Sequence, residues 1–531
     1  MKWTLVRDLA GVGLAAVMVV GSAGDWAMAQ SVAGAAAVVP GKMAKIATVD
    51  ERYQSFNVEM LEVTGGRFWA PYKAIKAAGP EAGKASVPTG MDPSLYRYRE
   101  PIDLGDARLR KLAAALGPIY LRVSGTWANS TYFQDNAEPQ MKTPPTGFGG
   151  VLTQRQWKGV LDFSKAVDAK IVTSFAVTPG VRDAEGVWTP VEAKKFLAYT
   201  KQAGGTIAAA EMFNEPTFSA MGGVAKGYDG AAYGRDFKAF RAYMKSASPE
   251  MLILGPGSIA EAGTMGEIKM KMLSTRDILT AAGRGVDGFS YHFYGQPSQR
   301  CRPTSTAAGD VEKVALSDDW LMRTTLDYAY YKKLRDQFEP GKPMWLTESG
   351  EAACGGDPWA ATYLDSFRYL NQLGALAKVG VRSVMHNTLA ASDYAVVDEE
   401  SMMPRPNYWA ALLWRKMMGS TVLEAGAAKT PGMYVYAHCE RGVVGGVSLL
   451  VINADAGAHA LRVPVKSERY TLSAKELQGG VVELNGVSLG LSAAGEVPKL
   501  QGKAQGAGRV EFGGRTITFL GMGGAGNGAC K

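Results

Sequence analysis

Residues that commonly bind metals are scarce in this 531-residue chain, and they do not cluster along it. No pair of cysteines forms a C-x-x-C motif, and no pair of histidines forms H-E-x-x-H. The cysteines are Cys301, Cys354, Cys439 and Cys530, and the histidines are His292, His386, His438 and His459. Zinc sites usually show such ligands at close spacing, so neither a metal nor another cofactor is predicted.

Long apolar runs and blocks of one charge are also missing. Beyond the first 30 residues no run of 18 apolar residues occurs, which argues against a transmembrane helix. Lysine and arginine number 58 against 50 acidic residues, a net charge of +8, but the basic residues are scattered. This balance indicates an ordinary basic surface, and no nucleic-acid partner is predicted. A hydrophobic content of 47% with 20% charged residues predicts a globular chain.

The first 29 residues have the pattern of a secretory signal peptide. Lys2 and Arg7 supply positive charge, an apolar stretch runs from Leu9 to Val20, and Ala27-Met28-Ala29 is an A-x-A cleavage site. Cleavage is predicted after Ala29, which implies a secreted or periplasmic protein with no membrane insertion after cleavage. An uncleaved N-terminal anchor is the alternative.

Short apolar runs alternate with segments of helical periodicity between residues 51 and 420. The runs are Tyr53–Met60, Ile119–Val123, Ile171–Val177, Thr206–Phe213, Leu252–Leu254, Phe289–Tyr294, Met344–Thr347 and Val381–His386. Eight such alternations predict an α/β fold, a (β/α)8 TIM barrel. An open doubly wound sheet also alternates, but no Gly-rich phosphate-binding turn follows the first predicted strand.

A different pattern begins near residue 421. Short alternating segments separated by Gly-rich turns predict an antiparallel β-sandwich for residues 421–531. Residues 30–50 precede the first barrel strand and are a candidate extra strand of that sandwich. The longest loops, Leu61–Gly105 and Tyr132–Gly150, follow the first and second barrel strands. Because loops at this end of a barrel usually shape the active site, we expect them to border it.

Two glutamates stand at the ends of predicted barrel strands. Glu215, in the sequence Asn-Glu-Pro, ends the fourth strand, and Glu348 ends the seventh. The carboxyl ends of strands four and seven face each other across a closed barrel, so both side chains are expected in one cleft. Two facing carboxyl groups suit glycoside hydrolysis, in which one protonates the leaving oxygen and the other attacks the anomeric carbon. The alternative is that each glutamate only caps a loop or forms a salt bridge.

Several further motifs resemble glycoside hydrolase family 79, which contains β-glucuronidases and heparanase. The matching segments are Leu121–Thr126, the Asn-Glu-Pro at 214–216, Glu348 followed by Cys354-Gly355-Gly356, Tyr394–Glu399, Pro406–Trp409 and Val435–Cys439. Together they extend from about residue 50 to the C-terminus. The resemblance implies a retaining glycosidase of clan A that acts on a uronic-acid-containing glycan or glucuronide.

The resemblance also implies catalytic roles. Glu215 is identified as the general acid/base, and Glu348 as the nucleophile of a double displacement. Asn214 would hydrogen-bond the sugar 2-hydroxyl, and Tyr294 would hold the Glu348 carboxylate in place. We expect negatively charged Glu348 to raise the pKa of Glu215. His292 is expected to be a structural histidine.

Other positions match the substrate pocket of the family. Backbone amides of Gly355 and Gly356 and the hydroxyl of Tyr394 would bind the uronate carboxylate, since a chain without Cβ approaches an anion closely. Glu59, and by a weaker match Asn387, would bind sugar hydroxyls.

The departures from the heparanase branch favour exo action. No removable linker and no heparan-binding basic cluster is evident, and the two long loops could close one side of the cleft. The prediction is an exo-acting β-glucuronidase. The alternatives are an endo-acting heparanase-like β-glucuronidase and a non-catalytic carbohydrate-binding protein.

The cysteines fit the same picture. Cys439 and Cys530 bracket the sandwich, while Cys301 and Cys354 follow neighbouring strands at the mouth of the barrel. Two disulfides, Cys439–Cys530 and Cys301–Cys354, are therefore hypothesised, the second bracing Gly355 and Gly356.

Overall fold

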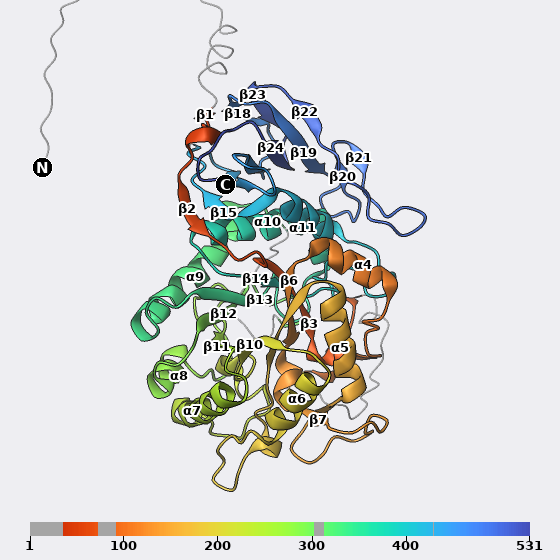
Figure 1. The fold of residues 1–531 in the computed structure, drawn as a ribbon, viewed down its shortest axis with the longest axis vertical. Helices are drawn as coiled ribbons and strands as arrows, with labels where there is room; N and C mark the ends of the chain where they lie inside the picture. The colour runs from red at the N-terminus through yellow and green to blue at the C-terminus, as the bar shows by residue number, and fades with distance from the viewer. Residues whose placement is uncertain (1–35, 73–91, 302–312, 428–429) are drawn as a thin grey trace, which may run out of the picture.

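The computed structural model describes residues 36–72, 92–301, 313–427 and 430–531. The predicted signal peptide, residues 1–29, lies outside these ranges. Figure 1 shows a large lobe of strands and helices, covered at one end by a smaller lobe of mostly blue strands. None of the helices in the described ranges has both the length and the apolar character needed to cross a bilayer.

Eight parallel strands form a closed barrel in the large lobe, which confirms the predicted fold class and excludes an open sheet. Each strand pairs with the next along the chain, and the last pairs with the first. The strands are β3 (Gln54–Glu59), β6 (Ile119–Ser124), β9 (Ala169–Ser174), β10 (Ile207–Glu211), β11 (Leu252–Ser258), β12 (Gly288–Tyr294), β13 (Met344–Gly350) and β14 (Val384–His386). In this order β10 lies across the barrel from β14 and β3.

Helices between the strands cover the barrel. They are α4 (Ala107–Leu116), α5 (Gln154–Ala166), α6 (Val191–Gln202), α7 (Gly230–Ala247), α8 (Thr275–Ala282), α9 (Asp318–Phe338), α10 (Tyr363–Lys378) and α11 (Pro406–Met417). Helix α5 illustrates why they form: Thr153 and Gln156 make a capping box, and Trp157, Val160 and Leu161 bury one face at helical spacing. The sequence did not predict α8, whose eight residues offer only two turns of periodicity.

The small lobe is a β-sandwich of two sheets. One sheet has the order β1-β18-β23, and the other runs β2-β15-β16-β17-β24-β19-β20-β21, with β22 beside β19. Their bounds are β1 (Ala36–Ala37), β2 (Lys45–Thr48), β15 (Met418–Leu423), β16 (Met433–Glu440), β17 (Val447–Asn453), β18 (His459–Val463), β19 (Ser467–Ser473), β20 (Glu483–Leu484), β21 (Val487–Ser488), β22 (Lys503–Gln505), β23 (Gly508–Phe512) and β24 (Thr516–Met522). Strand β2 is antiparallel to β15, and β1 is parallel to β18, so residues near the N-terminus contribute to both sheets.

The two lobes pack directly against each other through α10 and α11 (Figure 1). Tyr436 of β16 donates a hydrogen bond to Asn371 of α10 at 2.7 Å, and a Cβ at Gly374 would meet the Tyr436 ring. One apolar core continues from the barrel into the sandwich. Both hypothesised disulfides are present: Cys439–Cys530 joins β16 to the C-terminus, and Cys301–Cys354 joins the segments after β12 and β13.

The loop after β3 forms a short helix and a hairpin at the barrel mouth. These elements are α2 (Met60–Thr64), β4 (Gly66–Trp69) and β5 (Tyr96–Arg99), with residues 73–91 of the loop outside the described ranges. The loop after β6 forms β7 (Thr131–Gln134), which pairs with β8 (Gly150–Thr153).

Candidate active site

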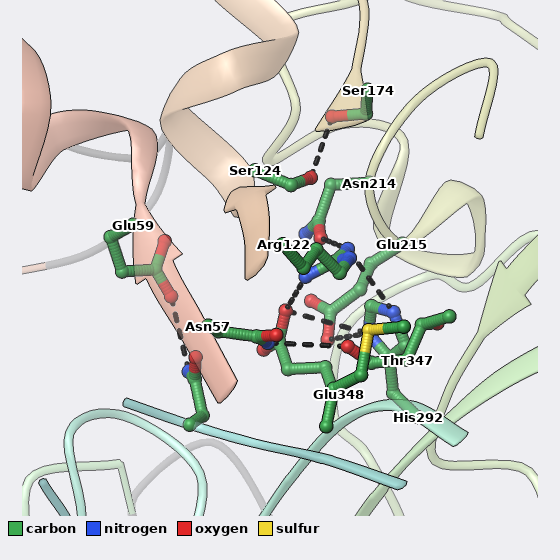
Figure 2. A network of polar contacts seen from close by, with 12 residues as sticks. Asn57, Glu59, Arg122, Ser124, Ser174, Asn214, Glu215, His292, Thr347 and Glu348 are labelled. Carbon is green, nitrogen blue, oxygen red and sulfur yellow. Dashed lines mark hydrogen bonds and ion pairs between the residues drawn. The ribbon is translucent and has the colours of Figure 1, made fainter. Parts of the chain in front are cut away.

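Glu215 and Glu348 lie close together at the mouth of the barrel (Figure 2). Glu215 follows β10, and Glu348 lies near the carboxyl end of β13. One oxygen of each carboxylate and one ring nitrogen of His292 all lie within 4.8 Å of one another. Retaining glycosidases hold their carboxyl groups roughly 5–5.5 Å apart, whereas inverting enzymes need about 6.5–9.5 Å to admit a water molecule. The approach of the two oxygens to within 4.8 Å is compatible with the shorter of these separations.

Arg122 of β6 forms the centre of the polar network. Its guanidinium donates to Glu348 Oε2 at 2.8 Å, to Glu211 Oε2 at 2.9 Å and to Asn214 Oδ1 at 2.7 Å. The side chain is 1% exposed, so this positive charge is almost completely removed from water. A buried cation of this kind is tolerated only with charged and hydrogen-bonding partners, and here it orients both Glu348 and the Asn214 amide.

Glu211, the last residue of β10, is the second fixed partner of Arg122. Thr347 donates a hydrogen bond to Glu211 Oε1 at 2.8 Å, while Arg122 contacts Oε2. Burial alone would raise the pKa of Glu211, but the charge of Arg122 and the surrounding hydrogen bonds, including that from Thr347, together outweigh burial and lower the pKa. Glu211 therefore stays ionised and balances one charge of the network.

His292 of β12, expected to be a structural histidine, contacts the acid/base candidate Glu215 directly. Its Nε2 lies 3.3 Å from the Arg122 guanidinium, and its Nδ1 lies 3.0 Å from Glu215 Oε1. Because arginine can only donate, Nε2 must accept and Nδ1 must carry the proton that it donates to Glu215. Burial lowers the pKa of His292 to about 4, so the ring remains neutral at ordinary pH.

The Glu215 carboxyl has a raised pKa, as expected, but for a different reason. Burial raises the pKa to about 7, Arg122 opposes this shift, and Glu211 adds to it. The expectation that Glu348 is the cause is wrong, because Arg122 lies against the Glu348 carboxylate and compensates its charge. Since Glu215 Oε1 accepts from His292, the proton of the acid form lies on Oε2.

Tyr294 and Asn387 connect Glu348 to the opposite side of the cleft. Tyr294 donates a hydrogen bond to Glu348 Oε1 at 2.8 Å, as the resemblance implied. The Asn387 amide nitrogen contacts the hydroxyls of Tyr294 and Tyr394, at 2.9 and 3.0 Å, and Glu59 Oε1 at 3.1 Å. The structure thus brings all five of these predicted residues into one hydrogen-bonded group.

Two polar atoms of this group have no hydrogen-bond partner within the described residues. They are Glu59 Oε2 and Asn387 Oδ1, and both side chains line the cleft. Burial, reinforced by the charge of Glu348, raises the pKa of Glu59 well above its usual range. A neutral carboxyl and an amide at the edge of the cleft can exchange hydrogen bonds with sugar hydroxyls.

Gly355 and Gly356 form a tight turn directly behind the cleft wall. Both have a left-handed φ of 82°, and a Cβ would lie 2.8 Å from Trp69 Cβ at Gly355 and 3.1 Å from the Tyr394 nitrogen at Gly356. These positions therefore require glycine. Tyr394 and Cys354 line the cleft, whereas neither glycine is among its lining residues.

Arg300 holds this turn in place. Its buried guanidinium donates to the carbonyl oxygens of Gly356 at 2.8 Å and Cys354 at 3.1 Å, and it forms an ion pair with Asp393. It also donates to the carbonyl oxygen of Ala70 at 2.7 Å. The loop after β3 is thereby connected to the loop after β13.

The cleft is open to solvent and contains about 800 Å³ of space. Its lining side chains are Glu59, Trp69, Thr126, Trp127, Glu215, Phe218, Met221, Ile259, Met265, Ile268, Met270, Tyr294, Pro297, Cys301, Glu348, Ala353, Cys354, Asn387 and Tyr394. The loop Tyr132–Gly150 was expected to border the cleft, but none of its residues lines it. This loop packs beside α2, where the Gln140 amide donates to the Thr64 carbonyl oxygen. The segment after β11 borders the cleft instead.

Glu215, His292 and Glu348 are also close enough to share a metal ion. The donor set fits this poorly, because Nδ1 of His292 carries a proton directed at Glu215 and Arg122 already contacts Glu348 Oε2. The arrangement suits proton transfer and nucleophilic attack better than metal binding.

Arg122 and Glu211 are the residues that sequence reasoning missed. A signal was present, since Arg122 interrupts the apolar run of β6 and a charge inside a buried strand requires a partner. The sequence could not name that partner, because Glu211 and Glu348 lie 89 and 226 positions away.

Comparison with known proteins assigns the chain to a family. Residues 100–374 match the family described as "Glycosyl hydrolase family 79, N-terminal domain". Heparanase-like protein 1 of Arabidopsis thaliana is 26% identical over 371 residues, covering 66% of this chain and 65% of that protein. Baicalin-beta-D-glucuronidase of Scutellaria baicalensis is 32% identical over 166 residues, covering 29% and 31%. The matched part thus spans less than two thirds of either relative.

A solved structure extends the likeness of fold to nearly the whole chain. The GH51 arabinofuranosidase of Xanthomonas axonopodis pv. citri has a TM-score of 0.59 at 16% identity, and the match covers 90% of this chain and 97% of that one. At this identity the likeness concerns the fold, a barrel with an attached β-sandwich.

Proposed function

This chain belongs to glycosyl hydrolase family 79, and we propose that it is a retaining exo-β-glucuronidase. It would remove terminal β-linked glucuronic acid from glycans or small glucuronides. The observation that carries the proposal is the pair Glu215 and Glu348, with one oxygen of each within 4.8 Å of the other, at a cleft that Glu59, Tyr294, Asn387 and Tyr394 also line. Of the two relatives named above, one is called a heparanase-like protein and the other a baicalin-beta-D-glucuronidase.

The reaction would proceed in two displacements. Glu348 attacks the anomeric carbon while Glu215 Oε2 gives its proton to the departing oxygen, so that a covalent glucuronyl-enzyme forms and the alcohol leaves. Glu215, now ionised, takes a proton from water, which attacks the same carbon and releases glucuronic acid and Glu348. Tyr294 and Arg122 each bind one oxygen of Glu348 and hold it for attack.

Recognition of the uronate would involve Tyr394 and the Gly355-Gly356 turn. Tyr394 reaches the cleft with its hydroxyl beside Asn387, and the turn lies directly against its backbone. Amides of a glycine turn can bind an anion where a side chain would block the approach. The Cys301–Cys354 disulfide and Arg300 keep this turn rigid.

Exo action is supported by closure of one end of the cleft. Arg300 connects Ala70 to Gly356, and Tyr72 donates a hydrogen bond to the Gly356 carbonyl at 3.0 Å. These contacts connect the loops after β3 and β13, on the side where Glu59 and Tyr394 would hold the sugar. A cleft closed on this side would admit only a chain end.

Export is part of the proposal. The segment 1–29 has the composition of a signal peptide, and two disulfides suit an oxidising compartment outside the cytoplasm.

A panel of chromogenic substrates tests the proposed activity. We expect kcat/KM for the β-glucuronide to exceed that for the β-glucoside and β-galactoside by about 10³-fold or more, because a site built for a carboxylate rejects sugars that lack it. The Tyr394→Phe variant should reduce this ratio. Cleavage of the neutral sugars at a similar rate would contradict the uronate pocket. Rapid loss of viscosity in a heparan sulfate digest would instead indicate the endo-acting alternative.

The pH dependence follows from the raised pKa of Glu215. The acid must be protonated to act, so we expect kcat/KM for an alkyl β-glucuronide to fall as the pH rises through about 7. A control substrate with an acidic phenol as leaving group needs less protonation and should show a weaker fall. If kcat/KM of the Glu215→Gln variant fell with rising pH just as in the wild type, another group would provide the proton.

A further inference from the structure

The cleft has a second, apolar part that the carboxylate chemistry does not use. One wall consists of Phe218, Ile259, Met265 and Ile268, which pack around Tyr294. Met221 and Trp127, which follow β10 and β6, also line this part, whereas Trp69 and the Cys301–Cys354 disulfide lie on the side of β13 and β3. We propose that this part is an aglycone site for apolar alcohols and phenols with aromatic or alicyclic rings. The inference rests on the proposed glucuronidase activity and specifies its substrates.

The apolar wall lies on the side from which the leaving group departs. Glu215 protonates the leaving oxygen, so the aglycone must lie beside this residue. Phe218 and Met221 follow Glu215 directly in the chain, and the remaining wall comes from the segment after β11, the barrel neighbour of β10. Thr217 fixes that segment, because its carbonyl accepts from Leu273 at 3.0 Å and its hydroxyl from Ile259 at 3.3 Å.

The sugar and the aglycone therefore meet opposite halves of the barrel mouth. Glu59, Asn387 and Tyr394 come from or follow β3 and β14, which lie across the barrel from β10 and β11. The polar group on that side suits hydroxyls, and the apolar walls near Glu215 suit a ligand without them.

Charge supports the same assignment. Among the described residues that line the cleft there is no lysine or arginine, although a sulfated or uronate-rich chain would need cations along its path. In the segment after β11, the exposed Lys269 and Lys271 alternate with Ile268 and Met270, which line the cleft. The alternation places the apolar side chains inward and the charges outward.

The composition of the walls suits a range of ring shapes. Methionine has three rotatable bonds and a polarisable sulfur, so Met221, Met265 and Met270 can adapt to different ligands. Trp127 adds a flat apolar face. Burial of a ring between such walls stabilises the bound substrate through the hydrophobic effect.

Kinetics with alkyl β-glucuronides of similar leaving-group acidity tests the proposal. We expect kcat/KM for cyclohexylmethyl β-glucuronide to exceed that for methyl β-glucuronide by roughly tenfold or more, from the apolar area removed from water. Met270→Lys should abolish most of this advantage, measured as the ratio of the two kcat/KM values within the variant, because a charged side chain no longer offers apolar contact to the ring. Lys271→Met is the matched control on the outward face and should change neither value.

The outcomes separate this inference from the proposed function. Cleavage of methyl β-glucuronide with no gain from the ring, or an advantage unchanged in Met270→Lys, would overturn the aglycone site but keep the glucuronidase. Higher kcat/KM for a glucuronyl disaccharide or a sulfated oligosaccharide than for the cyclohexylmethyl compound would overturn it as well. Failure to cleave any glucuronide, with a folded protein, would refute the activity on which the inference rests.

Discussion

Glu348→Gln is expected to lower kcat by about 10⁴- to 10⁶-fold for every β-glucuronide, because the residue that forms the covalent bond is lost. Glutamine keeps the shape of the side chain, and its amide oxygen can still accept the hydrogen bond from Arg122 or the one from Tyr294. It cannot attack the anomeric carbon. The assay is steady-state hydrolysis of a β-glucuronide with a phenol leaving group, whose departure needs little help from Glu215.

Chemical rescue distinguishes a lost nucleophile from a damaged protein. In Glu348→Gly, added azide should restore turnover and yield the glucuronyl azide of α configuration, by a single displacement from the opposite face. Glu192→Gln, a buried glutamate that binds Phe133 away from the cleft, is the matched control and should keep nearly full activity. More than a tenth of wild-type activity in Glu348→Gln would reject the assigned nucleophile. The non-catalytic binding alternative predicts instead that the wild type is inactive and the variant binds equally well.

Arg122→Met is expected to destabilise the protein by about 3–5 kcal/mol and to lower kcat by roughly 10³-fold or more. The substitution leaves the Glu211 and Glu348 carboxylates buried without their cation, at 0% and 7% exposure. Urea unfolding measures the change in the free energy of unfolding, and hydrolysis of the β-glucuronide measures the catalytic loss.

The pH dependence of that destabilisation identifies its cause. In the wild type the pKa of Glu211 is lowered, so its contribution to stability is present above the unfolded pKa and is lost as the pH falls through the folded pKa. Without Arg122 burial raises the pKa, so the carboxylate opposes folding above its unfolded pKa. The deficit of Arg122→Met should therefore be larger at pH 7.5 than at pH 5. Arg122→Lys keeps the positive charge, so its free energy of unfolding should lie between those of the wild type and Arg122→Met. An equal deficit at both pH values would point to lost packing rather than unpaired charge.

Much of the architecture could be predicted because its signals are local. Alternation of apolar runs and helical segments located every barrel strand, and strand-end positions brought Glu215 and Glu348 into one cleft. Turn-rich strands after residue 420 indicated the sandwich, and four widely spaced cysteines allowed two disulfides that the structure contains. Elements such as α8 and β19 were missed, because short or polar segments carry little periodicity.

The site depended more strongly on contacts between distant segments. The sequence alone determined which residue types stand at the strand ends: two glutamates, an asparagine before one of them, and a pair of glycines after the other. Only the tertiary structure decided that Arg122 neutralises Glu348, that His292 donates to Glu215, and that burial rather than Glu348 raises the pKa of the acid. It also replaced the expected wall of Tyr132–Gly150 with the apolar segment after β11. The reason is physical: periodicity acts over a few residues, whereas desolvation and Coulomb interactions depend on which strands become neighbours when the barrel closes.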